Sequence, residues 1–176
     1  MKILGAILAG GQSRRFGSDK AEAMFQGKAL LDHVDDALRP QCAELVIAGR
    51  VWDGIASVAD FPEPGLGPLG GLAGALHYAH CNGFDFVLSC GCDVLGIPEN
   101  LVEGLGTAPA ILDQLPIVGL WPAALADILA EWLAVPANRS VYRFAHHISA
   151  RNVSTPPSIT NVNCASDLIA AAFPKP

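Results

Sequence analysis

Basic residues are scarce in this chain, and charged residues of both signs are few. Of its 176 residues, 11 are lysine or arginine and 17 are aspartate or glutamate, which gives a net charge of −6. This balance argues against nucleic acid as a partner, because a protein that binds nucleic acid needs an extended basic face. A small polyphosphate needs only one basic patch.

Long uninterrupted apolar stretches are also missing, although 51% of the residues are hydrophobic. The most apolar helical stretch, residues 120–135, contains Pro122, Asp127 and Glu131 and therefore predicts no membrane span. The amino terminus does not resemble a signal peptide, because its short apolar run leads into glycines instead of a cleavage site. These features predict a cytoplasmic protein, and the length predicts one domain over residues 1–176.

Cysteine is too sparse and scattered to predict a disulfide framework. The chain has five cysteines, an odd number that favours reduced thiols. His77, His80 and Cys81 lie close together in the sequence, and Cys90 and Cys92 follow. A C-x-C pair without a partnering pair has the wrong spacing for a zinc ribbon or finger, so we expect no structural zinc.

Glycine and positive charge are concentrated at the start of the chain. The apolar run at residues 2–9 predicts a buried strand, and a loop of glycines and basic residues follows it. Glycines let main-chain N–H groups approach an anion, and basic side chains stabilise phosphate oxygens. The loop residues concerned are Gly10, Gly11, Arg14, Arg15, Gly17 and Lys20. The pattern predicts a phosphate loop, and the alternative is a strand that ends in a solvated basic turn.

Two common phosphate-binding motifs do not fit the sequence. A Walker loop requires Gly-Lys-Ser/Thr at its end, whereas Gly17 is followed by Ser-Asp-Lys. Residues 65–70 match G-x-G-x-x-G in letters, but they follow a proline-rich segment and not a strand. We therefore expect no dinucleotide site there.

The rest of the chain alternates between strand and helix patterns, which predicts an α/β fold with a parallel sheet. Pro and Gly at residues 61–71 predict a loop. The predicted strands are residues 44–48, 55–59, the apolar run that begins at Phe84, 115–120 and a last strand that contains Val153; the predicted helices are 29–38, 71–80 and 123–133.

A single carboxylate, Asp93, ends the apolar run that begins at Phe84. Ligands of open parallel sheets bind at the carboxyl ends of the strands. Aspartate is a hard anionic ligand that suits Mg²⁺ bridging to phosphate. The alternative is that Asp93 caps the following turn or the helix after Pro98.

These motifs together resemble the molybdenum cofactor guanylyltransferase family. The family's LAGGxSxRMGxDK corresponds to LAGGQSRRFGSDK, with Phe16 in place of methionine, and its Pro-Cys-Asp corresponds to residues 91–93. Its NVNTPEDL is similar to NVNCASDL at residues 161–168, which alone would predict a turn before a short helix. The resemblance covers nearly the whole chain in the expected order. The chain departs from the family pattern at Ile47, Gly91, Leu115 and Ser140.

The resemblance implies a fold and an activity. The fold is a three-layer α/β/α arrangement with a mostly parallel central sheet, Rossmann-like and similar to the nucleotide-diphospho-sugar transferases. The activity is a Mg²⁺-dependent nucleotidyltransferase reaction that joins GMP from GTP to the phosphate of molybdenum-bound molybdopterin and releases pyrophosphate. The implied protein partners are those that synthesise molybdopterin and the molybdoenzymes that accept the product.

The resemblance also implies roles for individual residues. Arg15, Lys20 and Asp93 form the catalytic set, in which Asp93 is the Mg²⁺ ligand and the two cations contact the triphosphate. The implied nucleotide-binding residues are Leu8, Ala9, Gly10, Gly11, Lys20, Asp60, Gly67 and Asp93. The implied residues on the pterin side are Gly71, Arg139, Asn161 and Asn163.

Two other functions stay open at this point. One is a related transferase that uses CTP or a sugar phosphate. LAGG argues against CTP, because cytidylyltransferase relatives typically have LAAG. The other is a nonenzymatic nucleotide- or pterin-binding protein on the same fold, motivated by the departures at Gly91, Leu115 and Ser140. Release of pyrophosphate would distinguish an enzyme from a binding protein.

Overall fold

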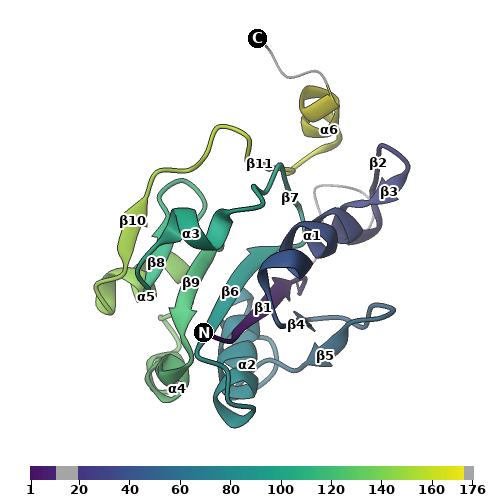
Figure 1. The fold of residues 1–176 in the computed structure, drawn as a ribbon. Coiled ribbons are helices and arrows are strands. Elements are labelled where there is room, and N and C mark those ends of the chain that lie inside the picture. Colours follow the sequence, from purple (N-terminus) through teal and green to yellow (C-terminus); the bar gives the residue numbers. More distant parts are fainter. Residues whose placement is uncertain (11–19, 173–176) are drawn as a thin grey trace.

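The fold is built around one sheet, seen in a computed structural model that describes residues 1–10 and 20–172 (Figure 1). All strands of this sheet run in one direction except β9, which is antiparallel to both of its neighbours. The predicted mostly parallel sheet is therefore confirmed. The strand order is β10 (Arg151–Val153), β8 (Ala110–Leu112), β9 (Gly119–Pro122), β6 (Phe86–Gly91), β1 (Ile3–Leu8), β4 (Glu44–Ala48) and β5 (Ala56–Val58).

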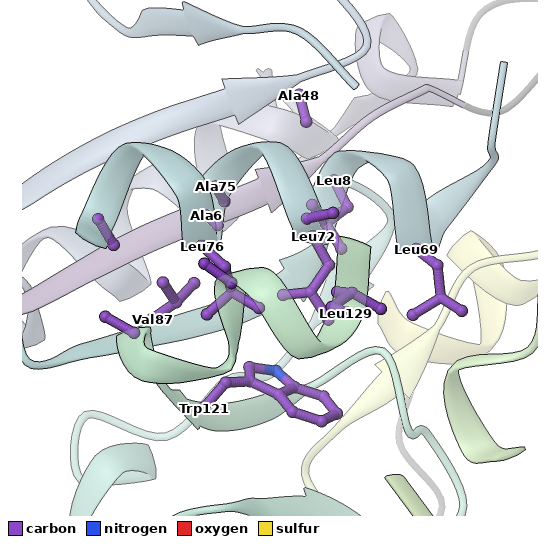
Figure 2. Packing of buried hydrophobic residues seen from close by; sticks show 14 of the residues in the cluster. Ala6, Leu8, Ala48, Leu69, Leu72, Ala75, Leu76, Val87, Trp121 and Leu129 are labelled. Carbon is purple, nitrogen blue, oxygen red and sulfur yellow. The ribbon is translucent and has the colours of Figure 1, made fainter. Parts of the chain in front are cut away.

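Helices cover both faces of the sheet and make it the middle of three layers. On one face, α2 (Pro68–Cys81), α4 (Ala126–Leu133) and α5 (Val141–His147) enclose a core that includes Leu72, Leu76 and Leu129, all fully buried (Figure 2). The opposite face is covered by α1 (Leu30–Leu38) and α3 (Leu101–Leu105). No helix within residues 1–10 and 20–172 has the length and apolarity that crossing a bilayer requires.

Small elements extend the fold beyond the main sheet. A hairpin of β2 (Met24–Phe25) and β3 (Lys28–Ala29) leads into α1. β7 (Val94–Leu95) pairs in antiparallel orientation with β11 (Thr160–Asn161), and α6 (Ala165–Ala172) follows β11. Short 3₁₀ turns complete the described elements: η1 (Lys20–Glu22), η2 (Arg39–Gln41) and η3 (Ala123–Leu125).

Two sequence-based boundaries are wrong. The predicted loop at residues 61–71 ends at Gly67, because α2 already begins at Pro68, whose fixed φ suits the first position of a helix. The predicted strand at residues 115–120 is a strand only from Gly119. Before it the chain turns, and the Val118 N–H donates to the Leu115 carbonyl at 2.9 Å. The side chain of Val118 is buried although the residue lies in a turn, so the apolar residues that suggested a strand here do not form one.

Gly74 lies where α2 contacts the chain after β5, and a Cβ at this position would collide with the carbonyl oxygen of Ala59. We expect Gly74→Ala to lower the free energy of unfolding by about 1–3 kcal/mol, because the main chain must move to admit the methyl group. Chemical denaturation measures the change. Gly104 in α3 is the matched control, since a Cβ there would meet nothing within 4 Å. Gly104→Ala should be neutral or stabilise by up to about 1 kcal/mol, and equal destabilisation by both substitutions would contradict this explanation.

Candidate active site

The carboxyl ends of the central parallel strands meet at one edge of the sheet. Leu8, the last residue of β1, lies opposite Ala48 of β4 on one side and Gly91 of β6 on the other. The Cys92 N–H donates to the Leu8 carbonyl at 3.2 Å, which extends the register past the end of β6. The segments leaving these strands are therefore brought together at the edge where open parallel sheets bind ligands.

The residues that follow β1 pack against the residues that follow β4. Gly49 has a φ of +89° and packs directly on the main chain of Gly10, so closely that a Cβ would collide with it. Arg50 donates from Nε to the Ala9 carbonyl at 3.3 Å. The predicted site residues Ala9 and Gly10, which follow Leu8, are thus held against the turn that leaves β4. Gly49 and Arg50 were not predicted as site residues, and a glycine and a cation directly after a strand are the signal that could have marked them.

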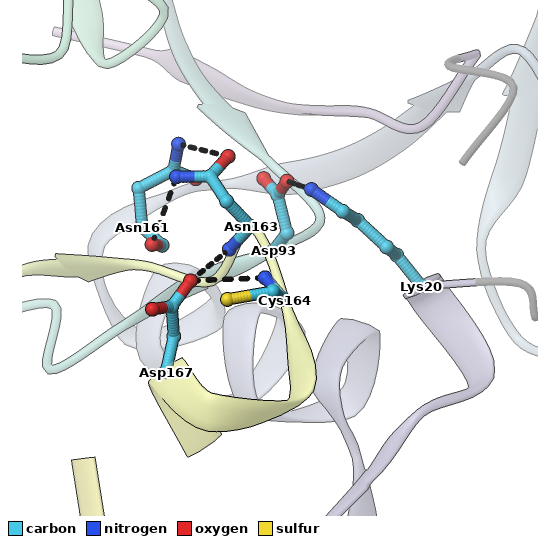
Figure 3. Close-up of polar contacts among 6 residues, drawn as sticks. All are labelled: Lys20, Asp93, Asn161, Asn163, Cys164 and Asp167. Atoms are coloured by element: carbon cyan, nitrogen blue, oxygen red, sulfur yellow. Dashed lines mark hydrogen bonds and ion pairs between the residues drawn. The ribbon is translucent and has the colours of Figure 1, made fainter. Parts of the chain in front are cut away.

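The far end of the opening loop returns to the sheet beside Asp93. The Nζ of Lys20 lies 3.2 Å from Oδ2 of Asp93, with 17% and 22% of the two side chains exposed (Figure 3). The residues predicted as a phosphate contact and a metal ligand are therefore adjacent. Gly11, Arg14 and Arg15 lie outside the residues that the structure describes, so their predicted roles stay predictions.

The surroundings of Asp93 suit a cation that is shared with phosphate. Mg²⁺ in such sites is bound by one or two carboxylates, and substrate phosphates and waters complete its coordination. Asp93 supplies one partly exposed carboxylate, and residues 1–10 and 20–172 contain no cluster of three or more metal-ligating side chains. This donor set fits Mg²⁺ held with a nucleotide and does not fit a closed metal cage. Gly91 leaves room for the carboxylate, because a Cβ there would come within 2.9 Å of Asp93 Oδ1.

A segment from late in the chain completes the site. The Val162 N–H donates to the Asp93 carbonyl at 2.8 Å, and Asn161 pairs with Val94 across β11 and β7. This pairing brings the two predicted asparagines next to Asp93 (Figure 3). Asn161 Nδ2 donates to Asn163 Oδ1 at 3.3 Å, and Asn163 Nδ2 donates to the Asn161 carbonyl at 3.4 Å. Amide side chains in this arrangement keep further donors and acceptors for a polar ligand.

Asp60 and Gly67 bracket the loop that precedes α2. The Asp60 carboxylate accepts from the Gly65 N–H at 3.1 Å, and Gly67 adopts a φ of +68° directly before the helix. Both residues lie beyond the carboxyl end of β5, which places them on the β4 and β5 side of the edge. Their contact with a nucleotide stays a prediction.

The two other residues predicted on the pterin side have mainly structural contacts. Gly71 is buried in α2, where a Cβ would come within 2.9 Å of the Ala48 Cβ. Arg139 lies between α4 and α5, and its Nη1 donates to the Leu133 carbonyl at 3.2 Å. Gly71 therefore allows α2 to pack closely on the sheet, and Arg139 satisfies a carbonyl at the end of α4. Their contacts with a second substrate stay predictions.

Asp167 is a further residue of this site that sequence analysis missed. Oδ2 of Asp167 accepts from the N–H groups of Asn163 at 2.6 Å and Cys164 at 2.9 Å. These two hydrogen bonds lower the pKa of Asp167, and the charge of Lys20 lowers it further. The signal was an acidic residue at the third position of a short helix, from which a side chain can reach back to the main chain before the helix.

Sequence comparisons relate this chain to known proteins. Residues 5–153 match the family model described as the MobA-like NTP transferase domain. A molybdenum cofactor guanylyltransferase of Cereibacter sphaeroides is 34% identical and aligns over 97% of this chain and 96% of its own. Its counterpart from Acidiphilium cryptum is 32% identical over 94% of this chain and 91% of its own.

Solved structures show the same fold. The molybdopterin-guanine dinucleotide biosynthesis protein A of Archaeoglobus fulgidus has a TM-score of 0.70 at 21% identity, with 96% of both chains covered. The 2-C-methyl-D-erythritol 4-phosphate cytidylyltransferase of Francisella tularensis has a TM-score of 0.67 at 13% identity, covering 98% of this chain and 99% of its own. At these identities the structural likeness concerns the fold alone.

Proposed function

Because this chain belongs to the family of MobA-like NTP transferases, we propose that it transfers GMP from GTP to the phosphate of molybdenum-bound molybdopterin and releases pyrophosphate. The curated relatives at 32% and 34% identity are named for guanylyl transfer to the molybdenum cofactor. The observation that carries the proposal is the placement of Lys20 beside Asp93, at the carboxyl edge where the opening loop leaves β1. Nucleotidyl transfer needs positive charge at the phosphates, which Lys20 would supply directly and Asp93 through a bound metal.

The reaction requires no nucleophile from the protein. An oxygen of the pterin phosphate attacks the α-phosphorus of GTP, the new P–O bond forms in line, and the bond from the α-phosphorus to the pyrophosphate oxygen breaks. Cys90, the thiol on β6, is unsuited to attack, because burial raises its pKa well above the usual range. The protein therefore contributes position and charge.

Charge builds up on the non-bridging oxygens and on the departing pyrophosphate during this step. The ammonium of Lys20 and the guanidinium of Arg15 stabilise these oxygens, and main-chain N–H groups at Gly10 and Gly11 hold the phosphates. Asp93 holds Mg²⁺, which supplies further positive charge to the phosphates when it is bound.

The two substrates approach Asp93 from opposite sides. The nucleotide occupies the side of β1, β4 and β5, near the remaining predicted nucleotide-binding residues Leu8, Ala9, Asp60 and Gly67. The pterin phosphate occupies the side of β7 and β11, near Asn161 and Asn163. Gly71 and Arg139, which the resemblance implies as further pterin contacts, lie away from these strands, since Gly71 packs against Ala48 of β4 and Arg139 follows α4. The protein works in the cytoplasm, between proteins that make molybdopterin and the molybdoenzymes that accept the dinucleotide.

Product analysis tests this function directly. The purified protein is mixed with GTP, Mg²⁺ and molybdenum-bound molybdopterin, and the products are identified by mass spectrometry. We expect the guanine dinucleotide and pyrophosphate in equal amounts. Parallel reactions with CTP or with sugar phosphates as acceptors test a related transferase. Binding of substrates without any release of pyrophosphate would instead identify a nonenzymatic binding protein.

Nucleotide selectivity gives a separate prediction. We expect GTP to bind about tenfold or more tightly than ATP, because a site matched to the N1–H and N2–H₂ donors of guanine leaves polar groups unpaired with adenine. CTP should also bind more weakly than GTP. The Asp60 carboxylate is one acceptor that could serve these donors. Calorimetric titration with the three Mg²⁺-nucleotides measures the difference, and equal affinity for GTP and ATP would contradict guanylyl transfer while leaving the broader nucleotidyltransferase function intact.

A further inference from the structure

We infer that Asp167 is a positioning residue for the second substrate: its carboxylate fixes the main chain that presents Asn161 and Asn163 beside Asp93. This inference rests on the proposed function, because it takes the asparagine pair as the acceptor side of the site. Asp167 itself needs no contact with either substrate. It acts through the segment that it holds.

The hydrogen bonds of Asp167 hold the carboxyl-terminal end of this segment in place. A single oxygen, Oδ2, accepts from two consecutive main-chain N–H groups, those of Asn163 and Cys164, at 2.6 and 2.9 Å. Hydrogen bonds to an ionised acceptor are shorter and about twice as strong as those between neutral groups. Asp167 lies in the first turn of α6, so the position of this helix is tied to the conformation of the residues that follow β11.

The other end of the segment is held by Asp93 itself. The main-chain N–H of Val162 donates to the Asp93 carbonyl at 2.8 Å, and the Val162 side chain is fully buried. Asn161 directly precedes the Val162 anchor and Asn163 directly follows it, and the two asparagine side chains also contact each other's residue. Loss of the Asp167 anchor would free the main chain at Asn163 while the pairing of β11 with β7 persists. Its effect should therefore fall on the acceptor side and spare the nucleotide side.

The charge of Asp167 also acts on the site. Lys20 lies 3.2 Å from Asp93, and its ammonium is near enough to Asp167 to lower the pKa of that carboxyl. The carboxylates of Asp93 and Asp167 thus both interact electrostatically with the ammonium of Lys20.

Steady-state kinetics on three substitutions of Asp167 test the inference. We expect Asp167→Ala to raise KM for molybdopterin about tenfold and to leave the affinity for Mg²⁺-GTP within about twofold. Asp167→Asn keeps a neutral acceptor of the same shape, so its KM should lie between those of the wild type and the alanine variant. Asp167→Glu keeps the charge and should recover part of the loss. Hydrogen exchange should speed up at Asn163 and Cys164 in the alanine variant.

Asp113 provides a matched control. Its Oδ1 accepts from the N–H groups of Gln114 at 2.8 Å and Thr155 at 3.0 Å, so it also ties two loop segments together. It follows β8, which is separated from β6 by β9. Asp113→Ala should therefore cost stability without changing either KM.

The outcomes separate the inference from the function on which it rests. A wild-type protein that releases no pyrophosphate would overturn the proposed function. A wild-type protein that transfers GMP, together with an unchanged KM for molybdopterin in Asp167→Ala, would overturn only the positioning role. Equal losses of affinity for both substrates, or the same kinetic effect from Asp113→Ala, would also overturn it, because these results indicate general destabilisation. Melting temperatures of all variants identify any that fail to fold, in which case Asp167→Asn decides.

Discussion

Asp93→Asn is expected to lower the rate of GMP transfer by about 100- to 1000-fold while the protein keeps its fold. The amide has nearly the shape of the carboxylate but carries no charge, so it binds Mg²⁺ poorly. The main-chain carbonyl of Asp93, which accepts from the Val162 N–H, is unaffected by the substitution. Single-turnover rates at limiting and saturating Mg²⁺ measure the effect, and saturating Mg²⁺ should restore only part of the rate.

Asp85 offers a control close to the same strand. Asp85 lies just before the start of β6 and Asp93 just after its end, and Asp85 accepts from the main-chain N–H of Lys2 at 2.6 Å. Asp85→Asn should leave the rate and its Mg²⁺ dependence unchanged. A wild-type rate for Asp93→Asn at limiting Mg²⁺ would show that the metal is held elsewhere.

Lys20→Ala is expected to lower kcat/KM for GTP by about 10- to 100-fold, because a hydrogen bond to a charged group is worth roughly 1.5–3 kcal/mol. The substitution also frees the Asp93 carboxylate from its ion pair with Lys20. Any gain in kcat/KM from this should be smaller than the loss caused by removing the phosphate contact. The same reasoning applies to Arg15→Ala on the strength of the sequence motif. Steady-state kinetics with varied GTP measures both variants. Unchanged kinetics in both would place the triphosphate away from the opening loop.

Lys28 is the matched lysine, since it pairs with Asp36 on the surface of α1. Lys28→Ala should have wild-type kinetics. A double-mutant cycle adds a second readout for the contact between Lys20 and Asp93. Because these side chains touch, the effects of Lys20→Ala and Asp93→Asn should be far from additive, whereas distant pairs add within about 0.5 kcal/mol.

Elements whose apolar pattern and length both indicate the same type of structure were predicted from the sequence. β1, β4, β6 and α1 were predicted to within a few residues, because a continuous apolar run marks a buried strand and an apolar stripe marks a helix. The start of α2 was misplaced, since Gly-Pro-Leu-Gly-Gly is typical of a loop until the contacts of its glycines with the sheet are known. β8, with three residues, is too short to give a pattern.

The site was predicted in part for the same reasons. Lys20 and Asp93 were identified by motif. The position of Asp93 follows from the meeting of strand ends at one edge of the sheet, whereas that of Lys20, in η1, does not follow from the strand pattern. The asparagine pair was identified by resemblance, but its position was not derivable from pattern. That position depends on two-residue strands whose partners are far apart in the sequence, and such pairing leaves no local signal. Asp167 was missed because its function depends on that pairing.

The same pairing determines the order in which the site can assemble while the chain is being made. A ribosome synthesises all seven strands of the central sheet before it reaches residue 160, and folding during synthesis begins from the amino-terminal part. A chain that ends at Val153 contains every strand of this sheet and can therefore form the sheet edge with Lys20 and Asp93. It lacks the Val162 N–H and both asparagines. Prematurely terminated chains of this length should thus be able to hold a nucleotide and unable to pass it on.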